Sequence, residues 1–132
     1  MSPTRKVVVI GAGPAGYVCA IRLAQLGQQV TVVEKEYLGG TCLNVGCIPS
    51  KALIAAGALV DRIAHAGAMG ISAENVRVDV ARLVEWKAGI VARLTGGIGT
   101  LLGKHGVEVV MGTASLIDRN SVRVTGEEGE RT

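Results

Sequence analysis

The feature that most restricts the fold of this chain is a glycine-rich turn between two apolar runs. Residues 6–35 read KVVVIGAGPAGYVCAIRLAQLGQQVTVVEK. The runs Val7 to Ile10 and Val30 to Val33 predict two strands, and the spacing between them predicts a helix from Pro14 to Leu26. The G-x-G-x-x-G pattern lies between the first strand and the helix. In that context it indicates a dinucleotide-binding fold.

Each glycine of this turn has a physical reason. Gly11 allows the tight turn, Gly13 lets a pyrophosphate approach the backbone, and Gly16 lets the helix pack closely on the strand. The phosphates would meet free N–H groups at the helix N-terminus. Glu34 ends the second run, where a carboxylate can accept a hydrogen bond from a ribose hydroxyl and would repel a 2′-phosphate. The motif alone does not choose between FAD and NAD.

Composition restricts the classes of protein to which this chain can belong. The chain has 132 residues, 48% of them hydrophobic, which suits one domain with one core. Its 19 glycines and the absence of Phe favour α/β layers packed through aliphatic side chains. The net charge of +3 is spread singly along the chain, which argues against nucleic-acid binding. No run of about 20 apolar residues and no signal-peptide core is evident, so we expect a cytoplasmic protein without a membrane segment.

Two cysteines, Cys42 and Cys47, stand at the ends of the segment CLNVGC. Fully extended, this segment would separate them by about 17 Å, so a disulfide requires the chain to fold back, which Gly46 permits. As a staple the bridge would contribute only about 2.2 kcal/mol, because the loop is short. Structural zinc needs four ligands. The chain offers only Cys19, His65 and His105 in addition, and all are distant in sequence.

The surroundings of the pair suggest redox chemistry. Pro49 is suited to the first turn of a helix running to about His65, so Cys47 should lie just before a helix N-terminus. The helix dipole and Lys51 would then stabilise a Cys47 thiolate, while Cys42 should be the more accessible sulfur. Structural disulfides are rare in the cytoplasm. We therefore expect a dithiol that exchanges electrons with a bound cofactor, for which a flavin is the natural partner.

The rest of the chain is less distinctive. Residues 71–75 suggest a loop, 78–102 a helix with three glycines that weaken it, and Val107 to Met111 a third parallel strand in a doubly wound sheet. A hairpin is expected from Ser115 to Val124, and the polar residues 125–132 suggest a turn toward a third strand that is missing. Cys19 and Trp86 are expected to be packing residues. The expected buried stripes are Ala15, Cys19, Leu23 and Leu26 on the first helix, and Leu83, Ile90, Leu94, Ile98 and Leu101 on the long helix.

The segment GGTCLNVGCIPSK, Gly39 to Lys51, together with the first strand unit, resembles the flavin segment of the pyridine nucleotide-disulfide oxidoreductases. Leu43 and the Ser50-Lys51 pair are most similar to the dihydrolipoamide dehydrogenase group, although mercuric reductases share the serine. The similarity covers nearly the whole chain. It implies an α/β, Rossmann-like FAD-binding domain over residues 1–132, with a parallel sheet and a β-hairpin or meander. This domain would be incomplete at its C-terminus, and the NAD and interface domains would be absent.

The resemblance also implies residue roles. Cys42 would exchange with dihydrolipoamide, and Cys47 would face the flavin as a charge-transfer thiolate. Ala114 would contact adenine through its backbone. The FAD pyrophosphate would lie along Gly11, Gly13, Pro14, Ala15 and Gly16, the adenosine ribose near Glu34 and Lys35, and the flavin near Gly40, Thr41, Cys42 and Lys51. No metal ligand set is implied.

The implied activity is the oxidation of dihydrolipoamide to lipoamide, with reduction of NAD through the disulfide and FAD. The implied partners are a second subunit in a homodimer and the lipoyl domains of 2-oxo acid dehydrogenase complexes. We expect the chain by itself to be inactive, as the first part of a longer enzyme. Two alternatives remain open. One is a mercuric or glutathione-type disulfide reductase, and the other is a flavin-binding fragment without catalytic function.

Overall fold

A parallel three-stranded sheet forms the centre of the protein. The computed structural model describes residues 4–127 and 129–132. Strands β1 (Lys6–Ile10), β2 (Gln29–Glu34) and β3 (Glu108–Met111) pair in the order β1-β2-β3. Val9 lies opposite Val32, and Val32 lies opposite Val109. The three predicted parallel strands are therefore confirmed, with bounds that shift by one residue at β1, β2 and β3.

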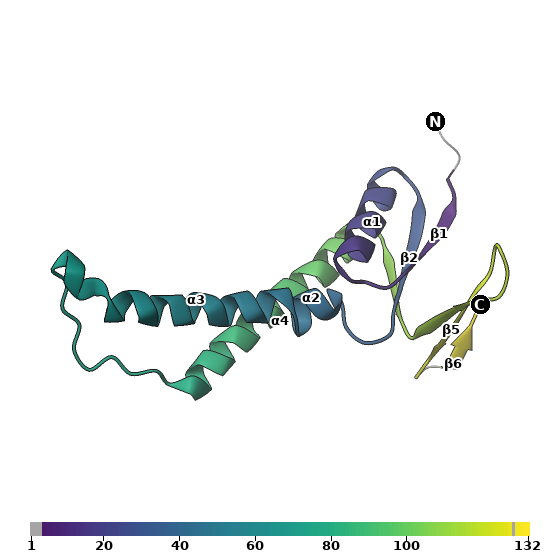
Figure 1. Ribbon diagram of the computed structural model, residues 1–132. Helices are drawn as coiled ribbons and strands as arrows, with labels where there is room; N and C mark the ends of the chain where they lie inside the picture. The colour runs from purple at the N-terminus through teal and green to yellow at the C-terminus, as the bar shows by residue number, and fades with distance from the viewer. Residues whose placement is uncertain (1–3, 128) are drawn as a thin grey trace.

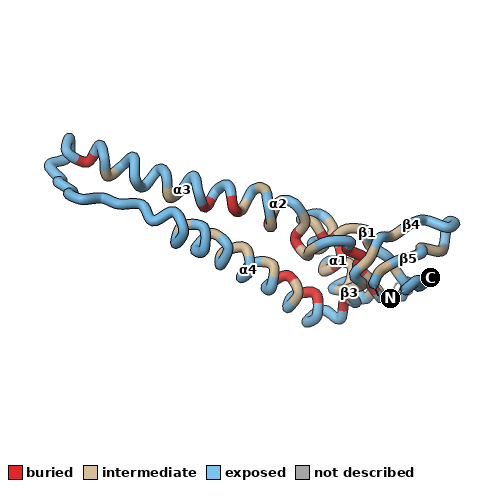
Figure 2. The backbone as a smooth tube through the Cα atoms, turned by 90° about the horizontal axis from the view of Figure 1, so that it is seen from below, coloured by how far each residue is buried: buried red, intermediate tan, exposed pale blue. Residues whose placement is uncertain are grey.

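The helices divide between the sheet and a projecting arm. Helix α1 (Pro14–Gln25) and the C-terminal part of α4 (Val80–Lys104) pack on the parallel sheet (Figure 1). Helices α2 (Gly40–Asn44) and α3 (Cys47–Ala64) follow β2, and the 3-10 turn η1 (Ala66–Met69) ends the outward path. Helix α3 and the first half of α4 form a long helical pair, which extends away from the sheet (Figures 1 and 2). We call this pair the helical arm.

Local chemistry explains where these helices begin. Pro14 occupies the first turn of α1, where its missing N–H costs nothing. Asp79 caps α4, because its side chain accepts a hydrogen bond from the Arg82 amide at 3.0 Å. The glycines near the end of α4 do not interrupt it. Helix α3 starts at Cys47, two residues before the predicted start at Pro49.

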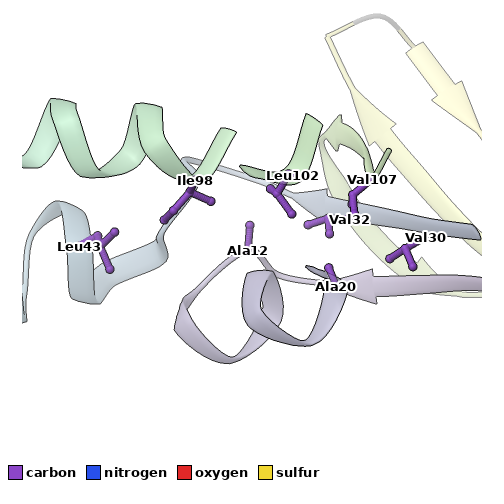
Figure 3. Packing of buried hydrophobic residues seen from close by; sticks show 8 residues of the cluster. All are labelled: Ala12, Ala20, Val30, Val32, Leu43, Ile98, Leu102 and Val107. Carbon is purple, nitrogen blue, oxygen red and sulfur yellow. The ribbon is translucent and has the colours of Figure 1, made fainter. Parts of the chain in front are cut away.

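The hydrophobic core lies where the sheet, the glycine turn and the cysteine segment meet. Leu102 and Val32 are fully buried at its centre. Leu43 of α2 joins the same cluster, so the cysteine segment is anchored to the core that supports the glycine turn. Figure 3 shows the eight side chains: Ala12, Ala20, Val30, Val32, Leu43, Ile98, Leu102 and Val107.

An antiparallel sheet follows β3. Strands β4 (Thr113–Leu116) and β5 (Val122–Gly126) confirm the predicted hairpin. The expectation that a third strand is missing was wrong, because β6 (Gly129–Arg131) pairs with β5. Its side chains are polar and it is held by ion pairs, so it lacks the alternating apolar pattern that identifies a strand. These pairs join Arg123 to Glu130 at 2.9 Å and Arg131 to Glu108 at 2.7 Å.

The second face of the parallel sheet differs from the expected doubly wound arrangement. In a doubly wound sheet helices cover both faces, but Val8 and Ile10 of β1 are exposed. A cavity of about 520 Å³ is lined by residues of both sheets, among them Val33 and Val122. The antiparallel sheet thus takes the place of a second helical layer on this face.

Several expected packing residues are exposed. Cys19 is exposed, because α1 turns Ala20 rather than the Cys19 stripe toward the sheet, and Ala15 and Leu26 of that stripe are exposed too. Trp86 is 50% exposed, and it lies in the first half of α4, away from the sheet. On the same helix Leu94 and Leu101 are exposed, whereas Ile98 and Leu102 are buried. The periodicity identified the helices correctly, but it placed their buried faces only in part.

One segment departs from the composition-based expectation. Residues Gly40–Ala64 are long and apolar enough to cross a membrane by length and composition, with a mean hydropathy of 1.5. The segment is not one straight helix, because Val45 and Gly46 separate α2 from α3. Helix α3 also packs along α4. Composition alone does not assign this segment to a membrane.

Candidate functional site

The glycine turn has the geometry that its sequence predicts. Gly11 has a φ of +93°, a left-handed conformation that favours glycine. Its amide donates a hydrogen bond to the Val33 carbonyl at 2.7 Å, which ties the turn to β2. A Cβ at Gly16 would overlap the Gly11 carbonyl. Both the tight turn and the close approach of α1 to β1 are therefore confirmed.

Glu34 is a buried carboxylate directly beneath this turn. Only 8% of the residue is exposed. Its Oε2 accepts a hydrogen bond from the Ala12 amide at 2.7 Å, and its Oε1 accepts one from the Glu36 amide at 3.0 Å. A carboxylate oxygen can accept two hydrogen bonds, so each oxygen retains one acceptor position. Glu34 can thus hold the turn and still accept a bond from a hydroxyl.

The cysteine segment touches the glycine turn directly. The Gly39 amide donates to the Ala12 carbonyl at 2.8 Å. Gly40 has a φ of +57°, and a Cβ there would lie 2.9 Å from the Gly13 Cα. The sequence interpretation placed Gly40 beside a flavin, but it missed the contact that joins the two motifs. The pair Gly39-Gly40 before a cysteine is the signal that could have revealed it.

A pocket of about 600 Å³ connects these motifs, within the usual range for ligand sites. Its wall is formed by the glycine turn, the end of β2, helix α2 and the junction between β3 and β4. Nine of the twelve expected cofactor residues line it, namely Gly11, Gly13, Pro14, Glu34, Lys35, Gly40, Thr41, Cys42 and Ala114. Ala15, Gly16 and Lys51 do not. The lining residues absent from that expectation are Ile10, Val33, Glu36, Tyr37, Gly112 and Thr113.

Gly13 provides a test of whether a ligand fits this wall. It lines the pocket and is the N-cap of α1, with an ordinary φ of −67°. A Cβ at Gly13 would meet no atom within 4 Å. Neither the backbone conformation nor the packing of the chain requires glycine there. The missing side chain leaves a cradle open beside the first turn of the helix, as a phosphate ligand requires.

The two cysteines lie together at the junction of α2 and α3. Cys42 is the third residue of α2, and Cys47 is the first residue of α3. Gly46 makes the reversal possible, since a Cβ there would lie 2.9 Å from the Thr41 carbonyl oxygen. Both cysteines are free thiols, near disulfide distance. The predicted fold-back of the segment is confirmed.

The Cys47 side chain perturbs the thiol of Cys42. A hydrogen bond with the Cys47 side chain raises the pKa of the Cys42 thiol, and desolvation raises it further. The Cys47 backbone and the charge of Lys51 oppose this shift of the Cys42 pKa with smaller effects. Cys42 therefore retains its proton and can donate it toward the Cys47 sulfur. Lys51 lies one helical turn beyond Cys47, near the pair but outside the pocket wall.

The expected accessibility of the two sulfurs was wrong. Cys42 is half-buried and packs against the core, whereas Cys47 is exposed. The short helix α2 is anchored by the buried Leu43, which carries Cys42 inward. Cys47 begins the helical arm, where fewer residues cover it. Cys42 nonetheless lines the pocket and Cys47 does not.

Among residues 4–127 and 129–132, no group of three or more His, Cys, Asp or Glu side chains is placed to hold a metal ion. Cys19 is remote from the pair in sequence and exposed on α1. The chemistry that the described residues support is therefore dinucleotide binding beside a dithiol.

The fold and this site define a class of protein. The family model described as pyridine nucleotide-disulphide oxidoreductase matches residues 5–131. The chain belongs to that family, which consists of soluble enzymes. It is 60% identical to dihydrolipoyl dehydrogenase from Bacillus subtilis over 125 residues, and 55% identical to that of Geobacillus stearothermophilus over 127 residues. These matches cover 95% and 96% of this chain but 27% of each relative.

Solved structures agree with this assignment. LpdA from Mycobacterium tuberculosis is 27% identical with a TM-score of 0.79, and it matches 98% of this chain and 30% of its own. The HOCl-induced flavoprotein disulfide reductase RclA from Escherichia coli is 28% identical with a TM-score of 0.74, over 98% of this chain and 26% of its own. The chain thus spans about a quarter of the length of the curated relatives that it matches.

Proposed function

We propose that this chain forms the FAD and dithiol portion of an enzyme that oxidises dihydrolipoamide and reduces NAD. One observation carries the proposal. The glycine turn, the Glu34 carboxylate and Cys42 line a single pocket. A dinucleotide that reaches from the turn to Cys42 would place a redox group beside the thiol pair. FAD is such a dinucleotide, and NAD would bind in a separate domain of the complete enzyme.

The pocket residues suit FAD in distinct ways. Gly13 and the first turn of α1 leave room for the pyrophosphate, and Glu34 has free acceptor positions for ribose hydroxyls. Gly40, Thr41 and Cys42 form the α2 wall on the proposed flavin side. The β3–β4 junction, with Ala114, is the proposed adenine contact. When bound, FAD would accept the electron pair of the dithiol and pass hydride onward.

The two cysteines would have different roles in thiol–disulfide exchange with dihydrolipoamide. In the oxidised pair a disulfide joins Cys42 and Cys47. A dihydrolipoamide thiolate attacks one sulfur, and its second thiol then closes the lipoamide disulfide, so that two electrons and one proton reach the pair and leave it as one thiol and one thiolate. Cys42 is the proposed exchanging sulfur, because attack on it releases the sulfur of Cys47, which lies where a helix N-terminus can stabilise a thiolate. Cys47, at the N-terminus of α3, is the proposed site of negative charge.

Partners and location follow from the same assignment. The proposed complete enzyme is a cytoplasmic homodimer that acts on lipoyl domains of 2-oxo acid dehydrogenase complexes. The exposed apolar side chains of the helical arm are compatible with such an assembly. The apolar segment Gly40–Ala64 would then contribute to protein packing.

Cofactor binding can be tested on the chain itself. Purified protein titrated into FAD should quench flavin fluorescence. A Gly13→Leu variant should lose at least about tenfold in affinity, since its side chain would fill the proposed phosphate cradle. A Cβ at this position meets no protein atom within 4 Å, so we expect the circular dichroism spectrum not to change. An equal FAD affinity in a folded Gly13→Leu variant would place the cofactor elsewhere.

Activity requires a completed protein. A chimera in which this chain replaces the matching quarter of the Bacillus subtilis relative should reduce NAD with dihydrolipoamide, whereas the chain alone should show no turnover. Cys42→Ser in the chimera should retain long-wavelength flavin absorbance without reductant, and Cys47→Ser should lose it. The opposite pattern would reverse the two roles. A folded, FAD-loaded chimera without activity would support a flavin-binding fragment instead.

A further inference from the structure

Asn44 lies between the two cysteines, and its side chain is bound to the backbone on both sides of the α2 start. Its Nδ2 donates hydrogen bonds to the Leu38 and Gly40 carbonyl oxygens, each at 2.9 Å. Both partners are acceptors, so only the amide nitrogen can occupy this position. The side chain is partly buried. The sequence interpretation assigned no role to this residue.

The two carbonyls mark the part of the chain that places Cys42. Leu38 precedes the Gly39-Gly40 turn, and Gly40 is the first residue of α2. Helix α2 has only five residues, far below the length at which a helix is stable by itself. Its position therefore depends on contacts outside its own backbone bonds. The Asn44 side chain ties α2 to Leu38, ahead of the helix, and fixes the first turn of α2 through Gly40, and the buried Leu43 supplies a contact with the core.

We propose that Asn44 is a positioning residue that holds Cys42 beside Cys47 and thereby lowers the reduction potential of the pair. The inference rests on the proposed function, in which these thiols form a reversible disulfide. A fixed α2 raises the effective concentration of one thiol at the other, which favours the closed disulfide. Releasing the Leu38 and Gly40 carbonyls would let α2 move and make the pair easier to reduce.

The decisive substitution is Asn44→Asp. It preserves shape but replaces the donor nitrogen with an anionic oxygen, which would face two carbonyl oxygens at hydrogen-bond distance. Asn44→Ala is the milder companion, since it removes both bonds without adding a charge. Asn75→Asp is the matched control, because it makes the same chemical change in an exposed loop far along the chain.

The measurement is the thiol–disulfide equilibrium of the chain with glutathione. The pair gives two electrons and two protons to one glutathione disulfide, which becomes two glutathione thiols. Mass spectrometry after acid quench and alkylation counts the closed and open forms. In all samples Cys19→Ser prevents a competing mixed disulfide on that exposed thiol.

We expect Asn44→Asp to lower the equilibrium constant for closure at least about tenfold, which corresponds to a rise of about 30 mV in potential. Asn44→Ala should lower it about threefold, because each neutral hydrogen bond has a modest net effect. Asn75→Asp should match the parent chain. Circular dichroism identifies any variant that does not fold, and if Asn44→Asp is unfolded, the folded Asn44→Ala variant decides.

The outcomes separate this inference from the proposed function. If the parent chain forms no disulfide between Cys42 and Cys47, the proposed redox role fails. If the parent closes normally and the folded Asn44 variants close with the same equilibrium constant, the positioning role is overturned while the redox role stands. A lower melting temperature with an unchanged equilibrium constant would also overturn it, since that result describes a purely structural residue.

Discussion

The sheet end of the protein and the helical arm contain similar apolar residues but use them differently. At the sheet end, Val32 and Leu102 are fully buried in one cluster that supports the pocket. On the arm, Ile54 is 68% exposed. Figure 2 shows buried backbone concentrated near the sheet and long exposed stretches along the arm. Apolar composition in this chain therefore predicts burial only where a second layer lies against the helix.

The glycines of the two regions differ in the same way. Gly16 is at the sheet end, where the Gly11 backbone occupies the space of a side chain. Gly57 is inside α3, where a Cβ would meet nothing within 4 Å. One glycine is required by packing, and the other weakens a helix through its conformational freedom. Substitution by alanine at Gly16 and at Gly57 should consequently have opposite effects on the free energy of unfolding.

The largest expected effect is that of Gly16→Ala. It should reduce the free energy of unfolding by about 3 kcal/mol or more, because the clash is with backbone that cannot move aside. Gly57→Ala should increase the free energy of unfolding by roughly 0.5–1 kcal/mol. Urea unfolding followed by circular dichroism measures both. Equal effects of the two substitutions would remove the distinction between the regions.

The next largest difference in unfolding free energy should come from substitution of a buried side chain at the sheet end and an exposed one on the arm. Val32→Ala should cost about 1.5–3 kcal/mol of unfolding free energy, since the side chain is fully buried beneath α1 and α4. Ile54→Ala should change it by less than about 0.5 kcal/mol, although it removes more carbon atoms. The same urea titration applies. A large loss in Ile54→Ala would mean that the arm is covered in solution, for example by a second copy of the chain.

The parts of the fold that sequence could predict are those with local causes. The glycine turn, the strands beside it and the reversal at Gly46 each follow from backbone sterics that a few neighbouring residues determine. The residues expected around the cofactor also lie together for the most part, since the turn and the strand end bring them to one edge of the sheet.

The predictions that were wrong concern positions that are determined by contacts between distant segments. Strand β6 is held by Arg131 and Glu108, which are far apart in sequence, and periodicity cannot detect such a pair. Cys42 is half-buried because α2 packs on α4 through Leu43 and Ile98. Trp86 was expected to be a packing residue, yet half of it is exposed on the helical arm. Tertiary partners, rather than local preference, decide these positions.

A smaller contrast separates the two cysteines, which lie on either side of the boundary between the regions. The hydrogen bond with the Cys47 side chain is the main cause that raises the pKa of Cys42, so Cys47→Ala, which removes that bond, should lower the pKa of Cys42 toward the ordinary value of 9.0 and partly restore its reactivity. In the fully reduced parent chain near pH 7, iodoacetamide should therefore modify exposed Cys47 before Cys42. Peptide mass spectrometry over a pH series gives both rates. Faster modification of Cys42 in the parent chain would contradict both its burial and its raised pKa.

The smallest expected effect concerns the ion pair that joins the two sheets. Hydrogen bonds from Arg131 and then from Thr31 lower the pKa of the Glu108 carboxyl below its usual 4.5. A lowered pKa in the folded state means that this stabilisation is fully present above about pH 4.5, and that it is lost as the pH falls through the lower, folded-state value. Both side chains are about half exposed, so solvent screening should limit the contribution to about 1 kcal/mol or less.

Glu108→Gln should therefore lower the melting temperature slightly at pH 7 and leave it nearly unchanged below the folded-state pKa, where the parent carboxyl is already protonated. Added salt should reduce the difference at pH 7, because the pair is accessible to ions. Glu74→Gln, in the exposed loop before α4, is the matched control and should have no comparable effect. If Glu108→Gln destabilises the protein equally at every pH, the loss arises from the hydrogen bond to Thr31 and from packing, not from the charge that ties β6 to the parallel sheet.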